Sequence, residues 1–263
     1  MKTVANDIVA WLKNYAETNN RKAFIVGVSG GVDSALVSTL CAMTGIPTHC
    51  VTLPCQTKVD QTDRGHQHIE WLEGKFENVK QHTLDLTNTF EEFFQTTRLD
   101  YSNELAYANS KSRLRMIALY QIATCVGGLV VGTGNKVEDH GVKFFTKYGD
   151  GGVDISPIGD LLKSEVRQMC RELGVLPQLC DAIPTDGLWD DTRTDETQLG
   201  ATYDELEWAM NYIATSNWGH PDYVNNSLVL TNRQVEILDT FNKWSKVGMH
   251  KMLPIPTFKR CLY

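Results

Sequence analysis

Short apolar runs alternate with stretches of helical periodicity through the first half of this chain. A continuous apolar or β-branched run bounded by glycine, proline or polar residues predicts a strand. The predicted strands are AFIVGV (23–28), THCVTL (48–53), VKQHTL (79–84) and GLVVGT (128–133). The predicted helices between them cover residues 34–42, 63–72, 89–95 and about 103–125. This alternation predicts an α/β protein in which helices flank a parallel β-sheet on both faces.

The remaining segments are predicted to be mostly helical. Apolar spacing predicts an N-terminal helix from Val4 to Tyr15, and IGDLLKSEVRQMCRELG predicts an amphipathic helix that ends at Gly174. Two further helices are predicted over 203–215 and 232–247, and capping boxes are predicted at Thr89 and Thr202. No internal repeat, low-complexity linker or shift in composition divides the chain, so residues 1–263 are expected to form a single domain.

Charge and cysteine usage exclude several classes of function. The net charge of −7 argues against a broad surface for nucleic acid. Seven scattered cysteines without a C-x-x-C pair indicate reduced thiols, as expected of a cytoplasmic protein. The N-terminus lacks the pattern of a signal peptide, and no apolar run is long enough to cross a membrane.

The string Gly27-Val28-Ser29-Gly30-Gly31-Val32-Asp33-Ser34 stands where the first predicted strand passes into a helix. Glycine amides and a helix N-terminus together favour phosphate binding. The string lacks the lysine of a kinase or GTPase phosphate loop, and it does not match G-x-G-x-x-G. Asp33 is informative, because its carboxylate would repel a bound phosphate unless a cation such as Mg²⁺ lay between them.

The alternative is a tight turn in which Asp33 or Ser34 only caps the helix. The full string nevertheless resembles the pyrophosphatase loop (PP-loop) of enzymes that cleave ATP between its α and β phosphates. That resemblance implies activation of a carboxylate, carbonyl or thiocarbonyl group by transfer of AMP.

Two later strings carry further candidate residues. In NSKSRLRM (109–116), Arg113 and Arg115 lie roughly 200° apart around a helix, so one of them can face a ligand. The strand that ends at Gly132 brings Thr133 and then Glu138 to the sheet edge where the glycine-rich loop lies. In FFTKYGDGGVD (144–154), Lys147 among aromatic residues and glycines suits an anion or a flat ring. Taken alone, the arginines are better explained as solvated cations on a helix face, and Lys147 fits an exposed residue of a tight hairpin at least as well.

Together these strings resemble the ammonia-dependent NAD synthetase family over nearly the whole chain. LLKSE, PTDGLW, TDETQLGATYDEL and MHK complete the match. The resemblance implies a Rossmann-like adenine nucleotide alpha hydrolase fold and a homodimer. It also implies an ATP-dependent ligase that converts deamido-NAD and ammonia into NAD, AMP and pyrophosphate through an adenylated carboxylate.

The resemblance also assigns roles to individual residues. Residues that would contact ATP are Gly27, Val28, Ser29, Gly30, Gly31, Val32, Asp33, Ser34, Thr133, Lys163 and Thr185. Residues that would bind deamido-NAD are Arg113, Lys147, Asp154, His250 and Lys251. Asp33 and Glu138 would ligate Mg²⁺. No side-chain nucleophile is expected, and Lys163 and Asp33 would contribute through charge and metal binding.

Other interpretations remain open for the chain and for single residues. Another PP-loop enzyme, similar to GMP synthetase or to tRNA-modifying enzymes, and a non-catalytic adenine-nucleotide sensor are the alternative functions. Asp195 and Glu196 fit a solvated acidic loop as well as a functional site. Free ammonia is the expected nitrogen source unless a separate subunit supplies it, because 263 residues leave no room for an additional amidase domain.

Overall fold

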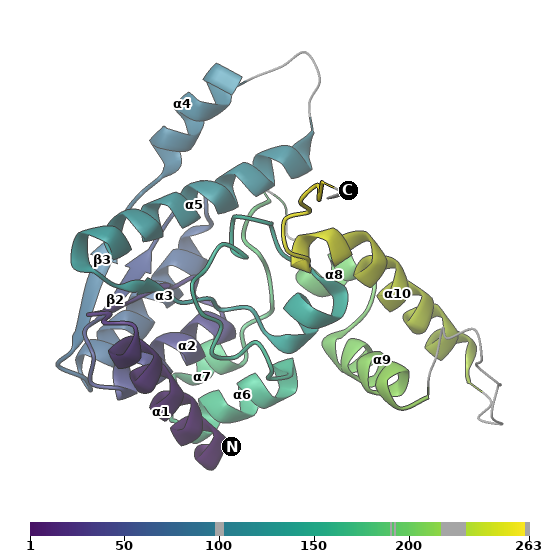
Figure 1. Ribbon diagram of the computed structural model, residues 1–263, viewed down its shortest axis with the longest axis horizontal. Helices are drawn as coiled ribbons and strands as arrows, with labels where there is room; N and C mark the ends of the chain where they lie inside the picture. Colours follow the sequence, from purple (N-terminus) through teal and green to yellow (C-terminus); the bar gives the residue numbers. More distant parts are fainter. Residues whose placement is uncertain (98–102, 190, 192, 217–229, 261–263) are drawn as a thin grey trace.

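A parallel sheet lies at the centre of the molecule (Figure 1). The computed structural model describes every residue except 98–102, 190, 192, 217–229 and 261–263. Within that part, the strands are β1 (Phe24–Gly27), β2 (Thr48–Thr52), β3 (Val79–Thr83) and β4 (Leu129–Val130). They are parallel throughout and follow the order β3-β2-β1-β4. The predicted fold class is therefore confirmed.

Both faces of the central strand β1 are buried. Phe24 and Val26 pack on one face against residues of α1, α2 and α6, whereas Ile25 packs on the other face against α5. Burial on two sides explains why β1 is a continuous apolar run rather than an alternating one. The edge strand β3 is instead mostly exposed, in keeping with its polar residues Lys80, Gln81 and Thr83.

Helices cover the sheet as the alternation of elements predicts. On the α2 side lie α1 (Lys2–Thr18), α2 (Val32–Met43), α3 (Val59–Glu73), α6 (Lys163–Glu172) and the short α7 (Pro177–Cys180). On the opposite side, α5 (Glu104–Val126) contacts β1 and β4, and α4 (Thr87–Thr97) packs against α5. The carboxyl ends of β1, β2 and β4 are left open to a cavity.

A second helical layer packs beside the sheet and closes one side of that cavity. It consists of η1 (Val137–Val142), α8 (Asp195–Leu199), α9 (Tyr203–Ser216) and α10 (Asn232–Met252). Val142, Leu206 and Ile237 belong to its shared apolar core. Figure 1 shows α9 and α10 lying together away from the sheet, in agreement with their contacts.

Several predicted helix boundaries need correction. The capping box predicted at Thr89 is wrong, because α4 begins at Thr87, whose amide donates to Asp85 Oδ1 at 2.9 Å. The capping box at Thr202 is confirmed by its reciprocal bonds with Glu205. α10 continues to Met252 and so contains both His250 and Lys251. η1 and α8 have too little periodicity to be visible in the sequence.

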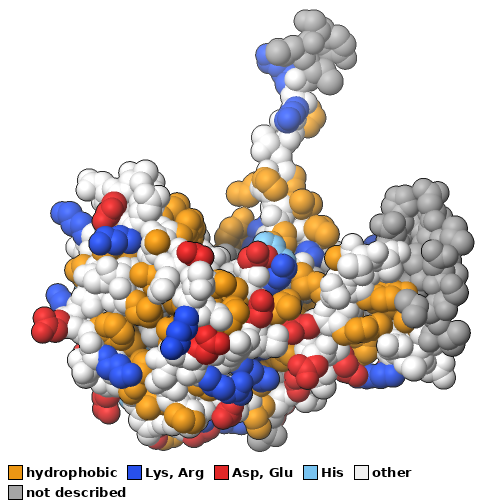
Figure 2. Space-filling model, turned by 90° about the horizontal axis from the view of Figure 1, so that it is seen from below, with side chains coloured by type: hydrophobic (Ala, Val, Ile, Leu, Met, Phe, Trp, Pro, Cys, Tyr) orange, Lys and Arg blue, Asp and Glu red, His pale blue; other side chains and the backbone are white. Residues whose placement is uncertain are grey.

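The surface carries charges of both signs. Figure 2 shows acidic and basic side chains interspersed over the face that it presents. Among the described residues, no helix is both long and apolar enough to cross a membrane. Six cysteines lie in the described residues, and all six are free thiols.

A buried histidine in the core predicts acid sensitivity of the fold. His68 is fully buried, its Nε2 lies 2.9 Å from Ser38 Oγ, and its ring stacks on Trp71. Burial lowers the pKa of His68 from 6.5 to about 4. Between these values the unfolded chain binds a proton that the folded chain does not, so stability falls as the pH drops.

We expect the free energy of unfolding to decrease by up to about 3 kcal/mol between pH 7 and pH 4 through His68 alone. Urea unfolding across this range measures the loss. His68→Gln should flatten that part of the pH dependence, whereas the matched variant His140→Gln on the exposed surface should leave it unchanged. An equally steep dependence in His68→Gln would contradict the assignment.

Candidate active site

The loop between β1 and α2 forms the floor of the cavity. Gly30 has φ +81°, and a Cβ at this position would run into the main-chain oxygen of Gln61, so glycine is required there. Ser34 Oγ accepts a hydrogen bond from the Ser29 amide at 3.2 Å and donates to the Gly31 carbonyl at 3.0 Å. The two serines therefore brace the loop against itself.

The N-terminus of α2 opens into the cavity without a side-chain cap. Its N-cap residue, Gly31, makes no side-chain hydrogen bond to the first turn. The amides of an uncapped helix start are hydrogen-bond donors without partners in the helix, and the helix dipole gives them a partial positive charge. This arrangement is suited to a phosphate group.

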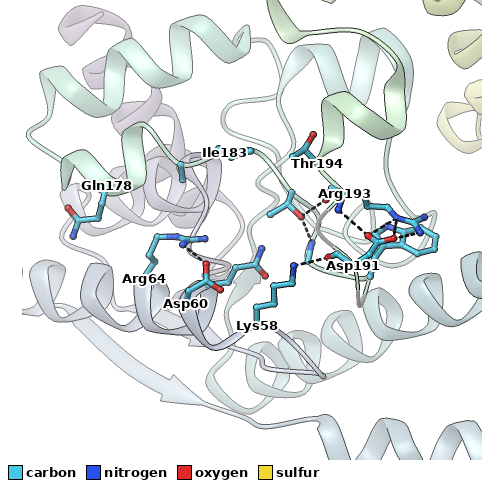
Figure 3. Close-up of a pocket in the computed structure, with 13 residues that line it drawn as sticks. Lys58, Asp60, Arg64, Gln178, Ile183, Asp191, Arg193 and Thr194 are labelled. Carbon is cyan, nitrogen blue, oxygen red and sulfur yellow. Dashed lines mark hydrogen bonds and ion pairs between the residues drawn. The ribbon is translucent and has the colours of Figure 1, made fainter.

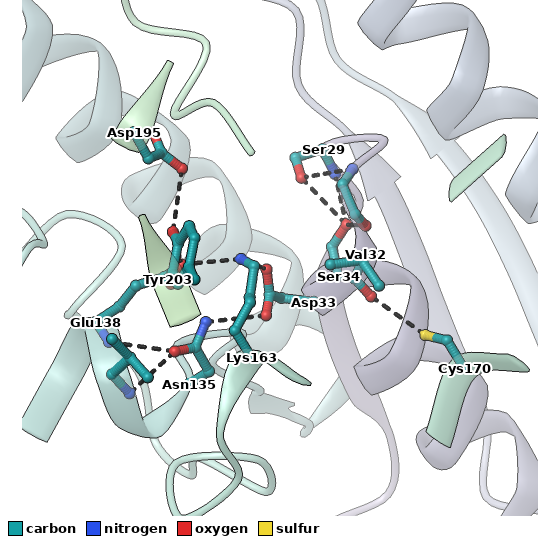
Figure 4. Close-up of polar contacts among 12 residues, drawn as sticks. Ser29, Val32, Asp33, Ser34, Asn135, Glu138, Lys163, Cys170, Asp195 and Tyr203 are labelled. Atoms are coloured by element: carbon teal, nitrogen blue, oxygen red, sulfur yellow. Dashed lines mark hydrogen bonds and ion pairs between the residues drawn. The ribbon is translucent and has the colours of Figure 1, made fainter. Parts of the chain in front are cut away.

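A buried cluster of charges lies directly beside this loop (Figure 4). Lys163, only 2% exposed, places Nζ 2.6 Å from Asp33 Oδ2 and 2.9 Å from Glu138 Oε1. The two carboxylates come from the first turns of α2 and η1, and the lysine is the first residue of α6. The partial positive charge of a helix N-terminus repels a lysine side chain, and the two carboxylates offset this repulsion.

Two neutral side chains hold the carboxylates in place. Asn135 donates from Nδ2 to Asp33 Oδ1 at 3.1 Å, and its own oxygen accepts the amides of Val137 and Glu138. Tyr203 donates its hydroxyl proton to Glu138 Oε1 at 2.5 Å. Sequence reasoning missed both residues, because only the folded chain brings η1, α6 and α9 together.

The protonation states of the cluster follow from burial and pairing. Burial alone would lower the pKa of Lys163, but Asp33 and Glu138 raise it above its ordinary value. Burial alone would raise the pKa of Glu138, but Lys163 and the Tyr203 hydroxyl lower it. For Asp33 burial prevails and the pKa is raised, although Lys163 partly offsets the effect. The lysine is thus held as a cation between acceptors.

The cavity above the loop measures about 670 Å³, within the range of small-molecule sites. The structure brings most of the predicted site residues to its wall. These are Gly27, Val28, Ser29, Gly31, Val32, Asp33, Ser34, Arg113, Thr133, Glu138, Lys147, Lys163, Thr185, His250 and Lys251. Gly30 turns away from the wall towards Gln61, and Asp154 lies outside it. Asp154 is exposed and accepts hydrogen bonds from the Tyr120 hydroxyl and the Val130 amide.

The two arginines of α5 have different surroundings. Arg113 is exposed and donates from Nε to the Lys147 carbonyl at 3.3 Å. Arg115 donates to the Leu53 carbonyl at 3.1 Å and to Thr57 Oγ1 at 2.9 Å, which ties α5 to the loop after β2. Both line the cavity, so position alone does not distinguish them.

Three other predicted residues make contacts within the protein. Lys147 Nζ donates to the His250 carbonyl at 3.1 Å. Lys251 Nζ donates to the carbonyls of Lys143 and Phe145, and it lies over the Phe145 ring. These bonds fasten the end of α10 to the loop after η1.

A smaller hollow of about 310 Å³ adjoins the main cavity (Figure 3). Its charged side chains are already paired: Arg64 with Asp60 at 2.9 Å and Arg193 with Asp191 at 2.5 Å. Lys58 donates to the Asp191 carbonyl at 2.7 Å. The two hollows share part of the 182–189 segment, including Thr185.

Asp195 differs from the solvated acidic residue that the sequence allows. It is the first residue of α8, it is buried, and it lines the main cavity. Its neighbour Glu196 accepts a hydrogen bond from the Tyr203 amide at 3.0 Å. Neither position could be recognised from the sequence, because α8 is one short turn inside a loop without periodicity.

Removal of the Tyr203 hydroxyl should weaken the cluster. In Tyr203→Phe the buried Glu138 loses a charge-assisted hydrogen bond, so we expect the free energy of unfolding to fall by about 2 kcal/mol. Urea unfolding at pH 7.5 measures the change, with Tyr15→Phe on α1 as the matched control. An unchanged midpoint in Tyr203→Phe would contradict the role given to this hydrogen bond.

Comparison with known proteins places these features in context. The chain matches the model of the NAD synthase family over residues 4–252. The NH(3)-dependent NAD(+) synthetase of Syntrophomonas wolfei is 38% identical over 85% of this chain and 88% of its own length.

Solved structures are similar in fold over almost the entire chain. NMN synthetase from Francisella tularensis has a TM-score of 0.82 and 28% identity, with 98% of each chain covered. The NH3-dependent NAD synthetase from Campylobacter jejuni has a TM-score of 0.76 with 98% of each chain covered, and at 17% identity it supports the fold alone.

Proposed function

The chain belongs to the NAD synthase family, and from this premise we propose that it is an ammonia-dependent ligase that amidates deamido-NAD at the expense of ATP. The products are NAD, AMP and pyrophosphate, and the reaction passes through an adenylated carboxylate. The observation that carries the proposal is the uncapped helix start beside the buried Asp33–Lys163–Glu138 cluster, inside a cavity of about 670 Å³.

ATP would lie with its phosphates on the loop from Gly27 to Ser34. The amides at the start of α2 would bind phosphate oxygens, and Lys163 would balance charge beside the α-phosphate. Thr133 and Thr185 line the same cavity and would complete the ATP contacts. Gly30 would act by shaping the loop, because its own position faces Gln61.

Asp33 and Glu138 have the donor chemistry that Mg²⁺ requires. Both are carboxylates, and both contact the Lys163 ammonium group. Among the described residues, Lys163 and Tyr203 both donate to the same oxygen of Glu138, Oε1. Mg²⁺ is usually bound by one or two carboxylates together with phosphate oxygens and water, so the pair fits. When bound, Mg²⁺ would supply positive charge to the phosphates of ATP.

Deamido-NAD would occupy the part of the cavity lined by α5, the loop after η1 and the end of α10. Arg113 would bind an anionic group of the substrate. Lys147 donates to the His250 carbonyl, and Lys251 donates to the carbonyls of Lys143 and Phe145. These bonds shape this wall. Asp154 is assigned to this substrate by resemblance, and in the structure it braces the edge of β4.

The chemistry requires positioning and charge stabilisation rather than a side-chain nucleophile. The nicotinate carboxylate attacks the α-phosphorus of ATP, and the bond to the leaving pyrophosphate breaks. Ammonia then attacks the activated carbonyl carbon and AMP leaves. Helix amides and Lys163 stabilise the charge that develops on the phosphate during the first step.

A second acceptor is favoured by one specific observation. The similarity to the Francisella NMN synthetase extends over 98% of both chains at a TM-score of 0.82. The corresponding candidate is amidation of nicotinate mononucleotide, which carries the same carboxylate and lacks the AMP half of deamido-NAD. The GMP synthetase-like, tRNA-modifying and sensor alternatives are not favoured by the family match.

Three broader features belong to the same proposal. Exposed apolar residues on the helices, including Leu105 and Ile117 on α5 and Val247 on α10, support a homodimer. The free thiols of the described residues support a cytoplasmic location. A family match from residue 4 to 252 supports a single synthetase domain over 1–263.

An end-point assay tests this function. The purified protein is incubated with ATP, Mg²⁺ and ammonium, with either deamido-NAD or nicotinate mononucleotide as acceptor, and then with glutamine in place of ammonium. We expect deamido-NAD and ammonium to yield amide product and pyrophosphate in equal amounts. Preference for the mononucleotide would select the second acceptor substrate. The absence of both amide product and pyrophosphate would overturn the synthetase assignment.

A further inference from the structure

Asp195 is a buried carboxylate that has no stated role in the site. Its exposed fraction is 7%, and among the described residues no hydrogen bond reaches its Oδ1. A buried acceptor without a donor costs free energy, so such an atom calls for an explanation. Asp195 also lines the main cavity, which places the carboxylate beside space that a ligand can enter.

The other carboxylate oxygen of Asp195, Oδ2, has no short hydrogen bond from Tyr203 either. Tyr203 Oη lies 3.4 Å from Asp195 Oδ2 and 2.5 Å from Glu138 Oε1 (Figure 4). A phenol has one proton, and the shorter contact takes it. Asp195 Oδ2 therefore does not receive the Tyr203 proton, and Oδ1 has no hydrogen-bond partner among the described residues.

The charges around Asp195 favour a cation as the missing donor. Burial first, and then Glu138 and Asp186, raise the pKa of Asp195 to about 7, while Lys163 and the Asp186 amide oppose the rise. The Lys163 ammonium is already shared by Asp33 and Glu138. Lys163 is therefore not available to Asp195 as a close cationic partner.

The reaction itself supplies a cation with the right chemistry. In neutral solution ammonia is present mainly as ammonium, which carries four N–H donors and one positive charge. A carboxylate is an acceptor-only group that can bind such an ion and remove a proton from it. We propose that Asp195 binds the ammonium ion that supplies the amide nitrogen and accepts one of its protons. This inference rests on the proposed function and adds a catalytic residue to it.

The step is balanced in atoms and charge. One N–H bond of ammonium breaks, its proton moves to Asp195, and the electron pair stays on nitrogen. That pair forms the C–N bond to the adenylated carbonyl, and the C–O bond to AMP breaks with its electrons on the phosphate oxygen. A second proton leaves the new amide nitrogen for solvent, and Asp195 releases its own proton afterwards.

The test compares two nitrogen nucleophiles in Asp195→Asn. Hydroxylamine is uncharged at neutral pH, so it needs no deprotonation before it attacks the same adenylate. We expect kcat/KM for ammonium to fall by about 100-fold, the scale of general-base catalysis, while the hydroxylamine reaction stays within about threefold of wild type. Asp204→Asn, at an exposed position near the start of α9, is the matched control and should behave as wild type.

Two further readouts separate this role from a structural one. ATP–pyrophosphate exchange reports adenylation without ammonia; it should persist in Asp195→Asn, and its absence from wild type would contradict the proposed function instead. The pH profile of kcat/KM for ammonium should change shape in Asp195→Asn, whereas the profile for hydroxylamine should match that of wild type. Equal losses for both nucleophiles in the variant, or an ammonium pH profile that the variant leaves unchanged, would overturn the role of Asp195.

Discussion

Replacement of Lys163 with methionine should reduce turnover by about 1,000-fold or more. Methionine has a similar length and an apolar end, so the change removes the positive charge with little change in volume. The variant loses the cation that would balance the α-phosphate. In other phosphoryl-transfer enzymes, an arginine that stabilises the transition-state charge is worth about 10³ to 10⁵ in rate. Initial rates of pyrophosphate release measure the effect.

The same substitution should also destabilise the fold. Asp33 and Glu138 would remain buried without their shared partner, and breaking a buried ion pair costs about 3–5 kcal/mol. Urea unfolding measures this cost. Lys136→Met is the matched control, because Lys136 pairs at 2.8 Å with Asp160, which is 93% exposed, and exposed pairs contribute little. A Lys163→Met enzyme with more than a tenth of wild-type turnover would contradict the account.

Asp33→Asn should nearly abolish Mg²⁺-dependent turnover, by about 1,000-fold, while leaving the fold intact. Asparagine keeps the shape of the side chain and can still accept the hydrogen bond from Asn135. It removes one of the two negative charges that would hold Mg²⁺ and weakens the contact to Lys163. Binding of ATP measured by calorimetry with and without Mg²⁺ should show that the variant loses most of the Mg²⁺ dependence.

Asp63→Asn serves as the control for this experiment, because Asp63 is an exposed residue of α3. It should keep wild-type turnover and the wild-type response to Mg²⁺. A fully active Asp33→Asn enzyme would exclude Asp33 as a metal ligand.

The sheet and its flanking helices were predictable because their patterns are local. β1 and β2 are apolar runs between polar loops, and α5 has an Asn103 cap and a glycine at its end, so its predicted limits differ from Glu104–Val126 by one residue at each end. The exposure of β3 was not predicted, although its polar residues Lys80 and Gln81 agree with the edge position that the sheet order gives it. α8 was hidden for a different reason: one turn of helix is too short to show a period.

The candidate site also has one part that was predictable from the sequence and one part that was not. The glycine-rich loop was recognisable because strand, glycines and helix start are contiguous in sequence. The Asp33–Lys163 contact joins residues 130 positions apart, and its 2.6 Å geometry is a product of packing between α2 and α6. Asn135, Tyr203 and Asp195 gain their roles only from burial around this contact, so their residue types alone carried no signal.

Transfer of a carboxylate oxygen to AMP tests the central claim most directly. Deamido-NAD labelled with heavy oxygen in its nicotinate carboxylate is converted with ATP, Mg²⁺ and ammonium, and the products are examined by mass spectrometry. Attack of the carboxylate on the α-phosphorus predicts one labelled oxygen in AMP and none in pyrophosphate. Unlabelled AMP, with the label in pyrophosphate or inorganic phosphate, would contradict an adenylated intermediate.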